Sequence, residues 1–594
     1  MRSLRYLNKY FRKYKTRLLL GILFVALSNV FAIYPAQVVR EALDLVVNKL
    51  STVDTHLSNS ITADIVRFAL IIIGLAFVKG VFMFFMRQTL IVMSRKIEYD
   101  LKNEIFTHYQ QLTLSFFRRN NTGDLMNRIS EDVTRVRMYL GPALMYTINL
   151  AVMVILIIIS MLSVSPKLTL YVLLPLPVLS LSIYFVSELM NRRSEQVQEE
   201  QSGLSTFVQE AVSGIRVLKS FVREQNSAST FADLSVKYKD TSMRLASVTA
   251  FFFPLMLLLV GASTLIVVYA GGREVMAGTI TPGVIAEFII YVNMLTWPVA
   301  SLGWVTAIVQ RAAASQERIN EFLQIKPDIV TGEKEVKLKG RIEFRDVSFT
   351  YPDTGIAALK NISFVVEQGK SLAILGRTGS GKSTVANLLV RIYDATSGRI
   401  MFDDADIAKL NLTSLRNQIG YVPQDVFLFS DSIANNISFG MNREGQVTGD
   451  KGQGMRVENA AREAVIYDDI ISFPKQFETI LGERGITLSG GQKQRVSIAR
   501  AIIRNPSILI FDDCLSAVDT NTEEKILNNL KKIMQGKTTV IISHRVSSVK
   551  NADEIIVLGN GYVAERGSHN ELMQRATIYR EVYEKQMLEE DIIE

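Results

Sequence analysis

The stretch SLAILGRTGSGKSTVANLLV, residues Ser371–Val390, decides how the second half of the chain folds. An apolar run leads into a glycine-rich turn and then into a second apolar run, which predicts a strand, a loop and a helix. Gly376, Gly381, Lys382 and Ser383 match the pattern G-x-x-x-x-G-K-[ST]. In such a loop, backbone N–H groups surround phosphates, the lysine reaches the β- and γ-phosphates, and the serine hydroxyl ligates Mg²⁺. The stretch therefore predicts a nucleoside triphosphate site in an α/β domain.

The first half of the chain has the composition of a membrane protein. The chain has 594 residues, 48% of them hydrophobic, and a mean hydropathy of +0.20, which is unusual for a soluble protein of this length. Six apolar segments are each long enough to cross a hydrocarbon core of about 30 Å as a helix. They lie at about 18–40, 63–92, 139–162, 166–188, 247–270 and 280–310. These spans predict an all-α membrane domain and exclude a soluble P-loop enzyme.

The charges between the spans predict the orientation of the chain. The first 17 residues hold seven Lys or Arg and no acidic residue, and the long connections at about 93–138 and 189–246 are also rich in Lys and Arg. Because positive charge stays on the cytoplasmic side, we expect the N-terminus, both connections and the C-terminal half in the cytoplasm. The pattern predicts a multi-pass membrane protein, and the lack of a targeting sequence fits the bacterial inner membrane.

The two long connections show heptad-like apolar spacing, so the membrane helices should continue well below the membrane. One connection turns near Asn120, Asn121 and Gly123, where Thr122 or Asp124 can cap the next helix. The other turns near Ser213–Phe221. We expect these two hairpin tips to contact a cytoplasmic partner, with plain connecting turns as the alternative.

The basic N-terminus carries apolar residues at helical spacing. These are Leu4, Leu7, Phe11, Tyr14 and Leu18. The spacing predicts a short amphipathic helix on the inner leaflet of the membrane rather than a transit peptide.

Some residues inside the expected spans are candidates for substrate contact. Lys79 lies near the middle of the second span and Arg87 nearer its inner end, and charges in a span usually face a cavity or a partner. Arg87 could instead snorkel to the interface. Aromatic residues that could line an apolar substrate cavity, or simply pack between helices, are Phe251, Phe252, Phe253, Trp297 and Trp304.

The net charge and the cysteine count exclude other classes. The net charge of +8 is explained by cytoplasmic Lys and Arg of a membrane protein, so no nucleic-acid partner is expected. The chain has one cysteine, Cys514, which excludes an internal disulfide and a cysteine-rich metal cluster.

A second motif separates transport ATPases from other P-loop proteins. In LSGGQKQRVSIARAII, residues Leu488–Ile503, the residues Ser489, Gly490 and Gly491 open a predicted helix whose free N–H groups can bind phosphate. With this motif between the phosphate loop and ILIFDD, the chain resembles the ATP-binding-cassette (ABC) transporters over nearly all its length. Six spans before one cassette resemble the half-size bacterial exporters of the multidrug and lipid-flippase type.

The resemblance implies ATP and Mg²⁺ as cofactors and a role for each motif residue. Tyr351 would stack on adenine, His544 would contact the γ-phosphate, and Gln424 would contact Mg²⁺ and the attacking water. The nucleotide-binding residues would be Tyr351, Gly376, Arg377, Thr378, Gly379, Ser380, Gly381, Lys382, Ser383, Thr384, Ser489, Gly490, Gly491 and Gln492. The metal ligands would be Ser383, Gln424 and Asp512, and the catalytic residues Asp513, His544 and Gln424.

The same resemblance implies a division of the chain and a partner. We expect a membrane domain at 1–325 with two cytoplasmic coupling helices, a linker at 326–340, a cassette at 341–580 and an acidic tail at 581–594. Leu481–Gly485 and Ser516–Asp519 resemble loops that communicate between subunits, and Gly440–Met455 looks like a surface insertion. Since the LSGGQ serine and glycines of this family complete the ATP site of the opposite subunit, the chain should be half of a dimer.

The implied function is ATP-driven efflux of a hydrophobic or amphipathic substrate, such as a drug, lipid or peptide, by alternating access. An importer would keep its membrane and ATPase parts on separate chains, and a peptide exporter with its own peptidase would need an N-terminal cysteine. The alternatives that stay open are an ATP-gated channel or regulatory subunit, and a fully active homodimeric lipid flippase.

One residue departs from the family pattern. In ILIFDDCLSAVD, Asp512 ends an apolar run and Asp513 stands where the family carries a glutamate that polarises water. An aspartate carboxylate lies about 1–1.5 Å further back, and a misplacement of about 1 Å can cost on the order of 10²-fold in rate. In this family the change is typical of one partner in heterodimers. We therefore favour a heterodimer whose Asp513 site hydrolyses ATP poorly, with an aspartate-based homodimer as the alternative.

Overall fold

The chain folds into two compact units. The computed structural model describes residues 2–51, 58–441, 451–482, 485, 487–514, 520–575 and 577–593. Unit 1 comprises Met1–Gln110 and Gly123–Ile325, and unit 2 comprises Gln111–Thr122 and Lys326–Glu594. The segment Gln111–Thr122 departs from the division expected at residue 325, because it folds with the C-terminal half.

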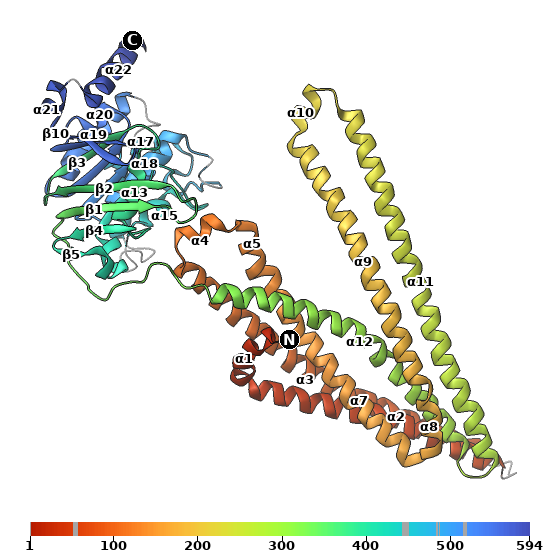
Figure 1. The fold of residues 1–594 in the computed structure, drawn as a ribbon. Coiled ribbons are helices and arrows are strands. Elements are labelled where there is room, and N and C mark those ends of the chain that lie inside the picture. Colours follow the sequence, from red (N-terminus) through yellow and green to blue (C-terminus); the bar gives the residue numbers. More distant parts are fainter. Residues whose placement is uncertain are drawn as a thin grey trace. The chain divides into compact units, whose positions relative to one another are not determined.

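The described part of unit 1 is built from helices (Figure 1). Its long helices are α2 (Lys15–Ser51), α3 (Ser58–Gln111), α7 (Leu144–Val164), α9 (Pro175–Ser213), α11 (Glu224–Met276) and α12 (Pro282–Leu323). Shorter helical segments are η1 (Ser3–Leu7), α1 (Asn8–Lys13), α5 (Thr122–Asn127), η2 (Arg128–Asp132), α6 (Val133–Met138), η3 (Tyr139–Ala143), α8 (Pro166–Leu173) and α10 (Ile215–Ser220). At 1.5 Å per residue, the 54 residues of α3 reach about 80 Å, so this helix continues far beyond a hydrocarbon core.

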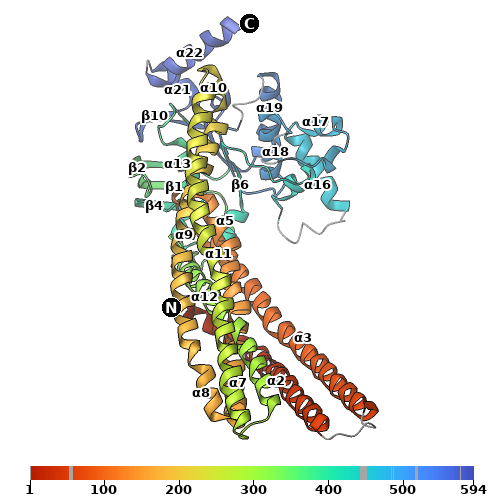
Figure 2. The same cartoon turned by 90° about the vertical axis from the view of Figure 1, so that its right-hand side faces the viewer.

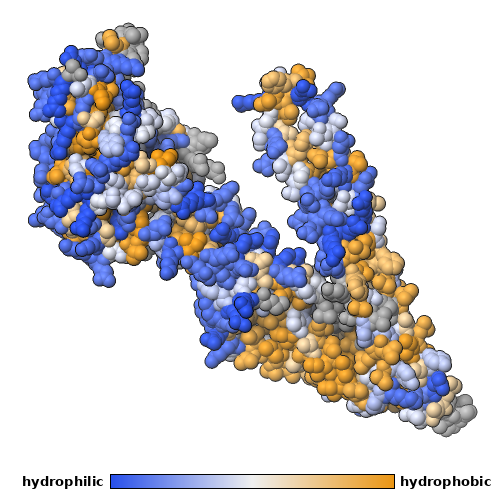
Figure 3. Space-filling view, viewed as in Figure 1, coloured by the Kyte–Doolittle hydropathy of each residue, from blue (hydrophilic) through white to orange (hydrophobic). Residues whose placement is uncertain are grey.

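Four helical stretches in the described residues are long and apolar enough to cross a membrane. They are Lys15–Lys49, Thr62–Gln111, Thr122–Val164 and Glu224–Met276, and Pro282–Thr296 is a shorter apolar helix. The segments 166–188 and 280–310, expected to be spans, fall on α8, α9 and α12, where several side chains lie outside the described residues. Apolar side chains gather over the part of unit 1 formed by α2, α7 and the adjoining end of α11 (Figure 3).

Helices α9 and α11 form a long antiparallel hairpin with α10 at its tip (Figures 1 and 2). Gly214 ends α9, and its N–H donates to the carbonyl of Glu210 at 2.8 Å. The tip presents apolar side chains to solvent, with Val217 61% and Phe221 72% exposed. Most of the surface of these two side chains is therefore left uncovered by the described part of unit 1.

The N-terminal segment packs against protein, which corrects the expectation of a helix on the lipid surface. Leu7 is fully buried and η1 contacts α12. Tyr6, Lys9 and Tyr10 all donate hydrogen bonds to the carboxylate of Glu104 on α3. The sequence pattern showed an apolar stripe, but it could not show that the half-buried carboxylate of Glu104 on α3 would fix that stripe against the bundle.

Unit 2 contains two sheets. The four-stranded sheet has the order β2-β1-β4-β5, and the six-stranded sheet has the order β10-β9-β3-β8-β7-β6. The strands are β1 (Ile342–Thr350), β2 (Ala357–Val366), β3 (Ser371–Gly376), β4 (Ser397–Phe402), β5 (Ala405–Asp406), β6 (Ile419–Val422), β7 (Ile508–Asp512), β8 (Thr538–Ser543), β9 (Glu554–Gly559) and β10 (Tyr562–Gly567). Strands β9, β3, β8, β7 and β6 run parallel, and all five residues of β7 are buried, as expected for a central strand.

Helices cover both sheets of unit 2. They are α4 (Leu114–Arg119), α13 (Lys382–Leu389), α14 (Leu412–Asn417), α15 (Ile433–Ser438), α16 (Lys451–Glu463), α17 (Tyr467–Ser472), α18 (Gly490–Ile502), α19 (Thr520–Met534), α20 (Val546–Val549), α21 (His569–Gln574) and α22 (Ile578–Ile593). Helices α16, α17 and α18 form a helical layer beside β6 (Figure 2). The boundary expected at residue 580 falls inside α22, so the expected tail continues a helix of the cassette.

Candidate nucleotide-binding site

Four parallel strands bring the predicted site residues to one edge of the sheet. Strands β3, β8, β7 and β6 are neighbours in parallel register. Their carboxyl ends are followed by the phosphate loop, His544, Asp513 and Gln424 respectively. Because ligands of open parallel sheets bind at the carboxyl ends of the strands, residues distant in sequence meet where a nucleotide is expected.

The loop from Gly376 to Gly381 has the shape of a phosphate cradle. Gly379 and Gly381 adopt φ values of +83° and +100°, which residues other than glycine rarely adopt. A Cβ on Gly379 would meet nothing within 4 Å, so this glycine borders open space. Ser380 Oγ is buried without a hydrogen-bond partner among the described residues. An anion in the loop would satisfy this orphaned donor.

The Lys382 side chain folds back onto the phosphate loop. Its ammonium donates to the carbonyls of Gly376 at 2.7 Å and Arg377 at 3.0 Å. Burial lowers the pKa of the Lys382 amine, while Asp512 and Asp513 oppose that shift. A phosphate would replace neutral carbonyl partners by a charged one, which makes a stronger hydrogen bond.

Three oxygen atoms lie together beside the start of α13. Ser383 Oγ lies 3.2 Å from Asp512 Oδ1 and 3.4 Å from Gln424 Oε1, and its single proton can serve one of them at a time. Burial raises the pKa of Asp512 to about 6. A hydroxyl, an amide oxygen and a carboxylate form the hard donor set that Mg²⁺ accepts beside phosphates. These residues therefore fit the expected metal.

Asp513 and His544 form a direct pair. His544 Nδ1 lies 2.8 Å from Asp513 Oδ1, and the Asp513 side chain is 12% exposed. The backbone of Asp513 is left-handed, with φ +49°, and its N–H donates to Ile542 O at 2.8 Å. Aspartate enters this region more readily than most side chains. The short carboxylate is therefore held at the edge of the sheet by its backbone and by the imidazole.

The expected adenine-stacking residue sits at the end of β1. The Tyr351 hydroxyl lies 2.9 Å from Thr384 Oγ1, within hydrogen-bond distance. The ring packs edge-on against Tyr393, with 5.6 Å between centroids. In unit 2, helix α4 reaches the same place: the Arg118 guanidinium lies 5.7 Å from the Tyr351 ring centroid, and Arg119 donates to Pro352 O at 2.6 Å. Sequence reasoning expected this hairpin tip to contact a cytoplasmic partner, but it did not identify Arg118 and Arg119 or the place that they meet, because nothing local shows that residues 111–122 fold with the cassette.

Helix α18 begins as its sequence predicts. Ser489 is the N-cap, and its hydroxyl and the Gln492 side chain form a reciprocal capping box. Gln492 Nε2 also donates to Asp469 Oδ1 at 2.8 Å. Ser489 and Gly490 are exposed. Among the described residues, the polar partners of this N-terminus come from the helix itself and from α17, so its phosphate-binding face is open.

Comparisons with known proteins define the family. The profile of the ABC transporter transmembrane region matches residues 18–299, and that of the ABC transporter matches residues 359–516. The multidrug resistance-like ATP-binding protein MdlA of Escherichia coli (strain K12) is 35% identical over 591 residues, 99% of this chain and 97% of that protein. The chain is a half-size ABC exporter.

The chain is also similar to a lipid flippase and to an ABC exporter of solved structure. The ATP-dependent lipid A-core flippase of Syntrophus aciditrophicus (strain SB) is 33% identical over 526 residues, 88% of this chain and 86% of the flippase. A bacterial Atm1-family ABC exporter with ATP bound superposes with a TM-score of 0.76 and 26% identity, covering 97% of this chain and 98% of the other. The cassette of this exporter is thus an ABC ATPase coupled to transport.

The C-terminal helix of the exporter holds the loop that carries His544. Gln586 on α22 donates from Nε2 to His544 O at 2.8 Å and accepts at Oε1 from Val546 N at 2.8 Å. The start of α22 is tied down as well, since Ile578 N–H donates to Glu565 Oε1 at 2.6 Å. Sequence reasoning missed Gln586, because a single glutamine in a charged helix carries no motif.

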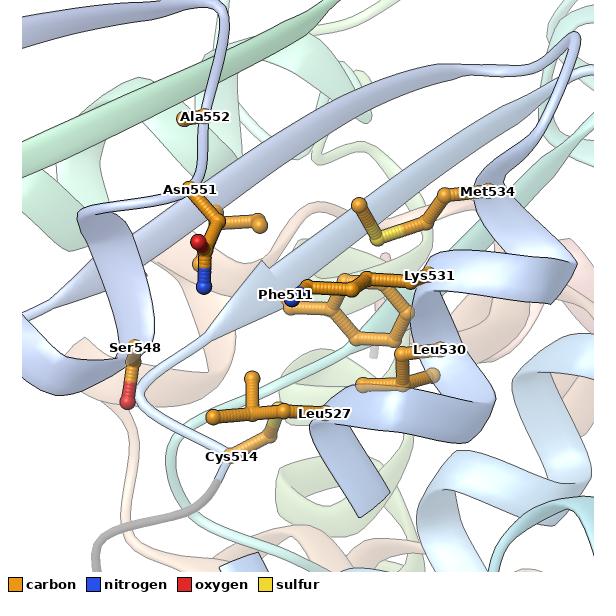
Figure 4. A pocket seen from close by; sticks show the side chains of 10 residues that line it. Phe511, Cys514, Leu527, Leu530, Lys531, Met534, Ser548, Asn551 and Ala552 are labelled. Atoms are coloured by element: carbon orange, nitrogen blue, oxygen red, sulfur yellow. The ribbon is translucent and has the colours of Figure 1, made fainter. Parts of the chain in front are cut away.

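Behind the nucleotide edge, β7 is supported by apolar packing. Phe511 lines a small cavity of about 50 Å³ together with Leu530 and Met534 of α19 (Figure 4). Cys514 lines the same cavity and is buried. The cysteine therefore belongs to the packing at the carboxyl end of β7, where Asp512 is the last residue of the strand and Asp513 follows it.

The membrane unit of the exporter contains a buried ion pair. Arg40 Nη1 on α2 lies 3.0 Å from Glu287 Oε2 on α12, and the Glu287 side chain is fully buried. Tyr291 donates to the other carboxylate oxygen at 2.8 Å. Sequence reasoning missed this pair. Asp44, one turn beyond Arg40, accepts from the backbone N–H of Gly283 at 2.8 Å, which ties the same two helices again.

The residues that were expected to contact substrate lie in different surroundings. Lys79 is exposed on α3, and no ion pair or hydrogen bond joins it to another described residue. Trp304 lines a cavity together with Arg87, whereas Phe251 and Phe252 on α11 are not part of it. The side chains of Phe253 and Trp297, residues 442–450, residues 483–484 and the loop Ser516–Asp519 lie outside the described residues.

Proposed function

We propose that the exporter is one half of a heterodimer and that its Asp513 site holds ATP but hydrolyses it slowly. The observation that carries this proposal is the pairing of Asp513 with His544 at 2.8 Å. The short carboxylate reaches the imidazole, but it lies about 1–1.5 Å behind the position a glutamate would reach toward water, enough to cost on the order of 10²-fold in rate. The intact LSGGQ stretch can complete a competent site on a partner that carries the glutamate.

Different residues at the edge of the sheet bind different parts of the Mg²⁺–ATP complex in this proposal. The N–H groups of the phosphate loop and the Lys382 ammonium hold the β- and γ-phosphates, and the Tyr351 ring provides the face for adenine. Ser383, Gln424 and Asp512 would hold Mg²⁺, which would supply positive charge beside the phosphate oxygens. His544 pairs through Nδ1 with Asp513, which leaves Nε2 as the ring nitrogen that would face the γ-phosphate.

The open face of α18 supports a dimer. Ser489 and Gly490 are exposed at the start of α18, and a phosphate held by a second cassette would occupy that helix terminus. A patch of aromatic side chains after Gln424 is also exposed, with ring centroids of Phe429 and Phe439 4.7 Å apart. We propose that this patch receives an α10 tip from the other subunit, so that cassette closure moves the membrane helices.

The transported molecule is a hydrophobic or amphipathic compound moved out of the cytoplasm by alternating access. ATP binding favours closed cassettes over open ones, a shift of population between two states. We propose that the exporter lies in the bacterial inner membrane with its N-terminus and cassette in the cytoplasm, which the Lys and Arg residues between its spans support. An ATP-gated channel shares this fold, and flux measured against a concentration gradient separates the two.

The test is ATPase activity of the chain purified alone in lipid, beside Asp513→Glu and Asp513→Ala variants, with nucleotide binding measured on the same samples. Low turnover with normal binding in the wild type, and gain of turnover in Asp513→Glu, support the proposal. Full turnover in the wild type that only Asp513→Ala abolishes would favour the active homodimer. Size-exclusion light scattering of the lipid-embedded protein then gives the number of chains.

A further inference from the structure

A cavity in unit 1 combines a cation with an apolar wall. It has a volume of about 630 Å³ and lies between α3, the segment η3–α7 and α12. Its polar lining comes from Arg87 and Gln88 on α3. Its apolar lining includes Phe84, Met145, Tyr146 and Trp304. All these elements belong to one compact unit.

The polar end of the cavity lacks a counter-charge. Among the described residues, no ion pair or hydrogen bond joins Arg87 or Gln88 to another side chain, and both are exposed. None of the described residues that line the cavity is acidic. A guanidinium in a membrane segment is costly unless it meets an anion or water. Its planar fork of donors suits the oxygens of a phosphate or carboxylate.

The apolar end is built from adaptable and aromatic side chains. Tyr146 and Trp304 meet edge to face, with 5.5 Å between ring centroids. Met145 is buried against them, and a thioether side chain fits irregular apolar shapes. Phe84 lies one helical turn before Arg87 on α3, so the apolar wall continues from the cation toward the membrane centre.

The position of the cavity along the helices matches the level of lipid headgroups. Arg87 lies near the inner end of the span expected at 63–92, Tyr146 near the inner start of 139–162, and Trp304 near the inner end of 280–310. At the boundary of the inner leaflet, a bound amphipath can keep its charged group at Arg87 while its chain lies on the apolar wall. Snorkelling alone would satisfy Arg87 with water but would not require a cavity beside it.

We propose that this cavity binds an anionic amphipath, with a phosphate-bearing headgroup at Arg87 and Gln88 and an acyl chain against Phe84, Met145 and Trp304. The inference rests on the export function proposed above, and it names the class of the substrate. A cationic drug would place like charge against Arg87 and is disfavoured.

Trp304 provides a direct test, because the chain has two tryptophans and Trp297→Phe leaves one reporter on the cavity wall. The protein is embedded in phosphatidylcholine nanodiscs without nucleotide. Quenching of Trp304 is then titrated with lysophosphatidic acid or lysophosphatidylcholine, both carrying the same brominated acyl chain. We expect half-maximal quenching at about a tenfold lower mole fraction of the anionic lipid, the effect of one charged contact.

Variants assign the preference to Arg87. Arg87→Gln should remove it and Arg87→Lys should keep most of it, whereas Lys79→Gln, the same charge loss on the same helix outside the cavity, should leave it unchanged. Glycerol 3-phosphate, a headgroup without a chain, should not reverse the quenching at equal concentration.

Equal quenching by both lipids, or an anionic preference that survives Arg87→Gln, would overturn the proposal. Reversal of the quenching by glycerol 3-phosphate would also overturn it, because the site would then bind free phosphate. Since the measurement uses no ATP, its failure is distinguishable from a failure of the proposed ATPase behaviour.

Discussion

His544 Nδ1 lies 2.8 Å from Asp513 Oδ1 and 3.0 Å from Asp513 Oδ2, so the imidazole occupies both oxygens of the short carboxylate. Because a single ring nitrogen contacts both oxygens, each oxygen keeps a lone pair that can accept a hydrogen bond from water. The same imidazole is the group expected to contact the γ-phosphate through its other nitrogen. The pair therefore couples the short carboxylate to His544 without involving the phosphate loop or the expected metal ligands.

The first prediction separates the contribution of His544 to ATP turnover from that of the length of the acidic side chain at position 513. We expect Asp513→Glu to raise steady-state ATP turnover in lipid by about tenfold or more, because the carboxylate then extends by about 1–1.5 Å. Adding His544→Ala should abolish this gain, while ATP affinity changes little. Turnover and nucleotide affinity are measured on the wild type, His544→Ala, Asp513→Glu and the double variant. A gain that persists without His544 would show that the imidazole takes no part.

The second prediction concerns Gln586, which hydrogen-bonds to the main chain on both sides of Arg545. Gln586→Ala should lower turnover in the Asp513→Glu background by about threefold to tenfold, since each lost hydrogen bond contributes about 1 kcal/mol to the position of the loop. The KM for ATP should change little, because the phosphate loop is not involved.

Controls for Gln586 come from the same helix. Glu584→Ala removes only an exposed ion pair with Arg580 and should leave turnover unchanged. Gln586→Glu keeps the acceptor for Val546 N–H but loses the donor to His544 O, and we expect an intermediate turnover. A Gln586→Ala protein that loses thermal stability but keeps normal turnover would assign α22 a purely structural role.

The sequence was sufficient where local rules decide the structure. The glycines of the phosphate loop, the apolar strand that ends at Asp512 and the N-cap at Ser489 each follow from residues within a few positions. The contacts of Gln586 and of Arg118 could not be predicted in this way. Each joins segments far apart in the chain, and neither periodicity nor composition specifies which partner a side chain meets.

The N-terminal segment illustrates the same limit. Its stripe of apolar residues is equally suited to a lipid surface and to a groove between helices. Glu104 decides between them, because Tyr6, Lys9 and Tyr10 converge on its carboxylate. Glu104 is one of several acidic residues in α3, and its role depends on how α3 packs.

The third prediction tests the tip of the α9–α11 hairpin. Val217→Asp or Phe221→Asp should place a charge on the exposed apolar surface of the tip and prevent its docking on a partner cassette. We expect transport to fall at least tenfold while basal ATP turnover falls much less, because the nucleotide site is not altered. Ser220→Asp, a charge beside the apolar surface, should have a smaller effect. Equal loss of both activities in Val217→Asp would argue against a coupling role for the tip.

The fourth prediction concerns the buried pair of Arg40 and Glu287. Removing one partner of a buried pair leaves an uncompensated charge and costs about 3–5 kcal/mol. Arg40→Met should be more damaging than Glu287→Gln, because Glu287 is fully buried whereas the Arg40 side chain is 28% exposed and can reach water. Glutamine also keeps an acceptor for the Tyr291 hydroxyl.

The double variant Arg40→Met with Glu287→Gln completes a thermodynamic cycle for this pair. With both charges gone, thermal unfolding in detergent should occur at a higher temperature than in Arg40→Met alone, and the two single effects should not add. Lys49→Met, which breaks an ion pair with Asp64 whose side chain is 32% exposed, serves as the matched control and should lower the melting temperature far less. Strict additivity of Arg40→Met and Glu287→Gln would mean that the two charges do not stabilise the contact of α2 with α12, and that backbone bonds such as Gly283 N–H to Asp44 hold it instead.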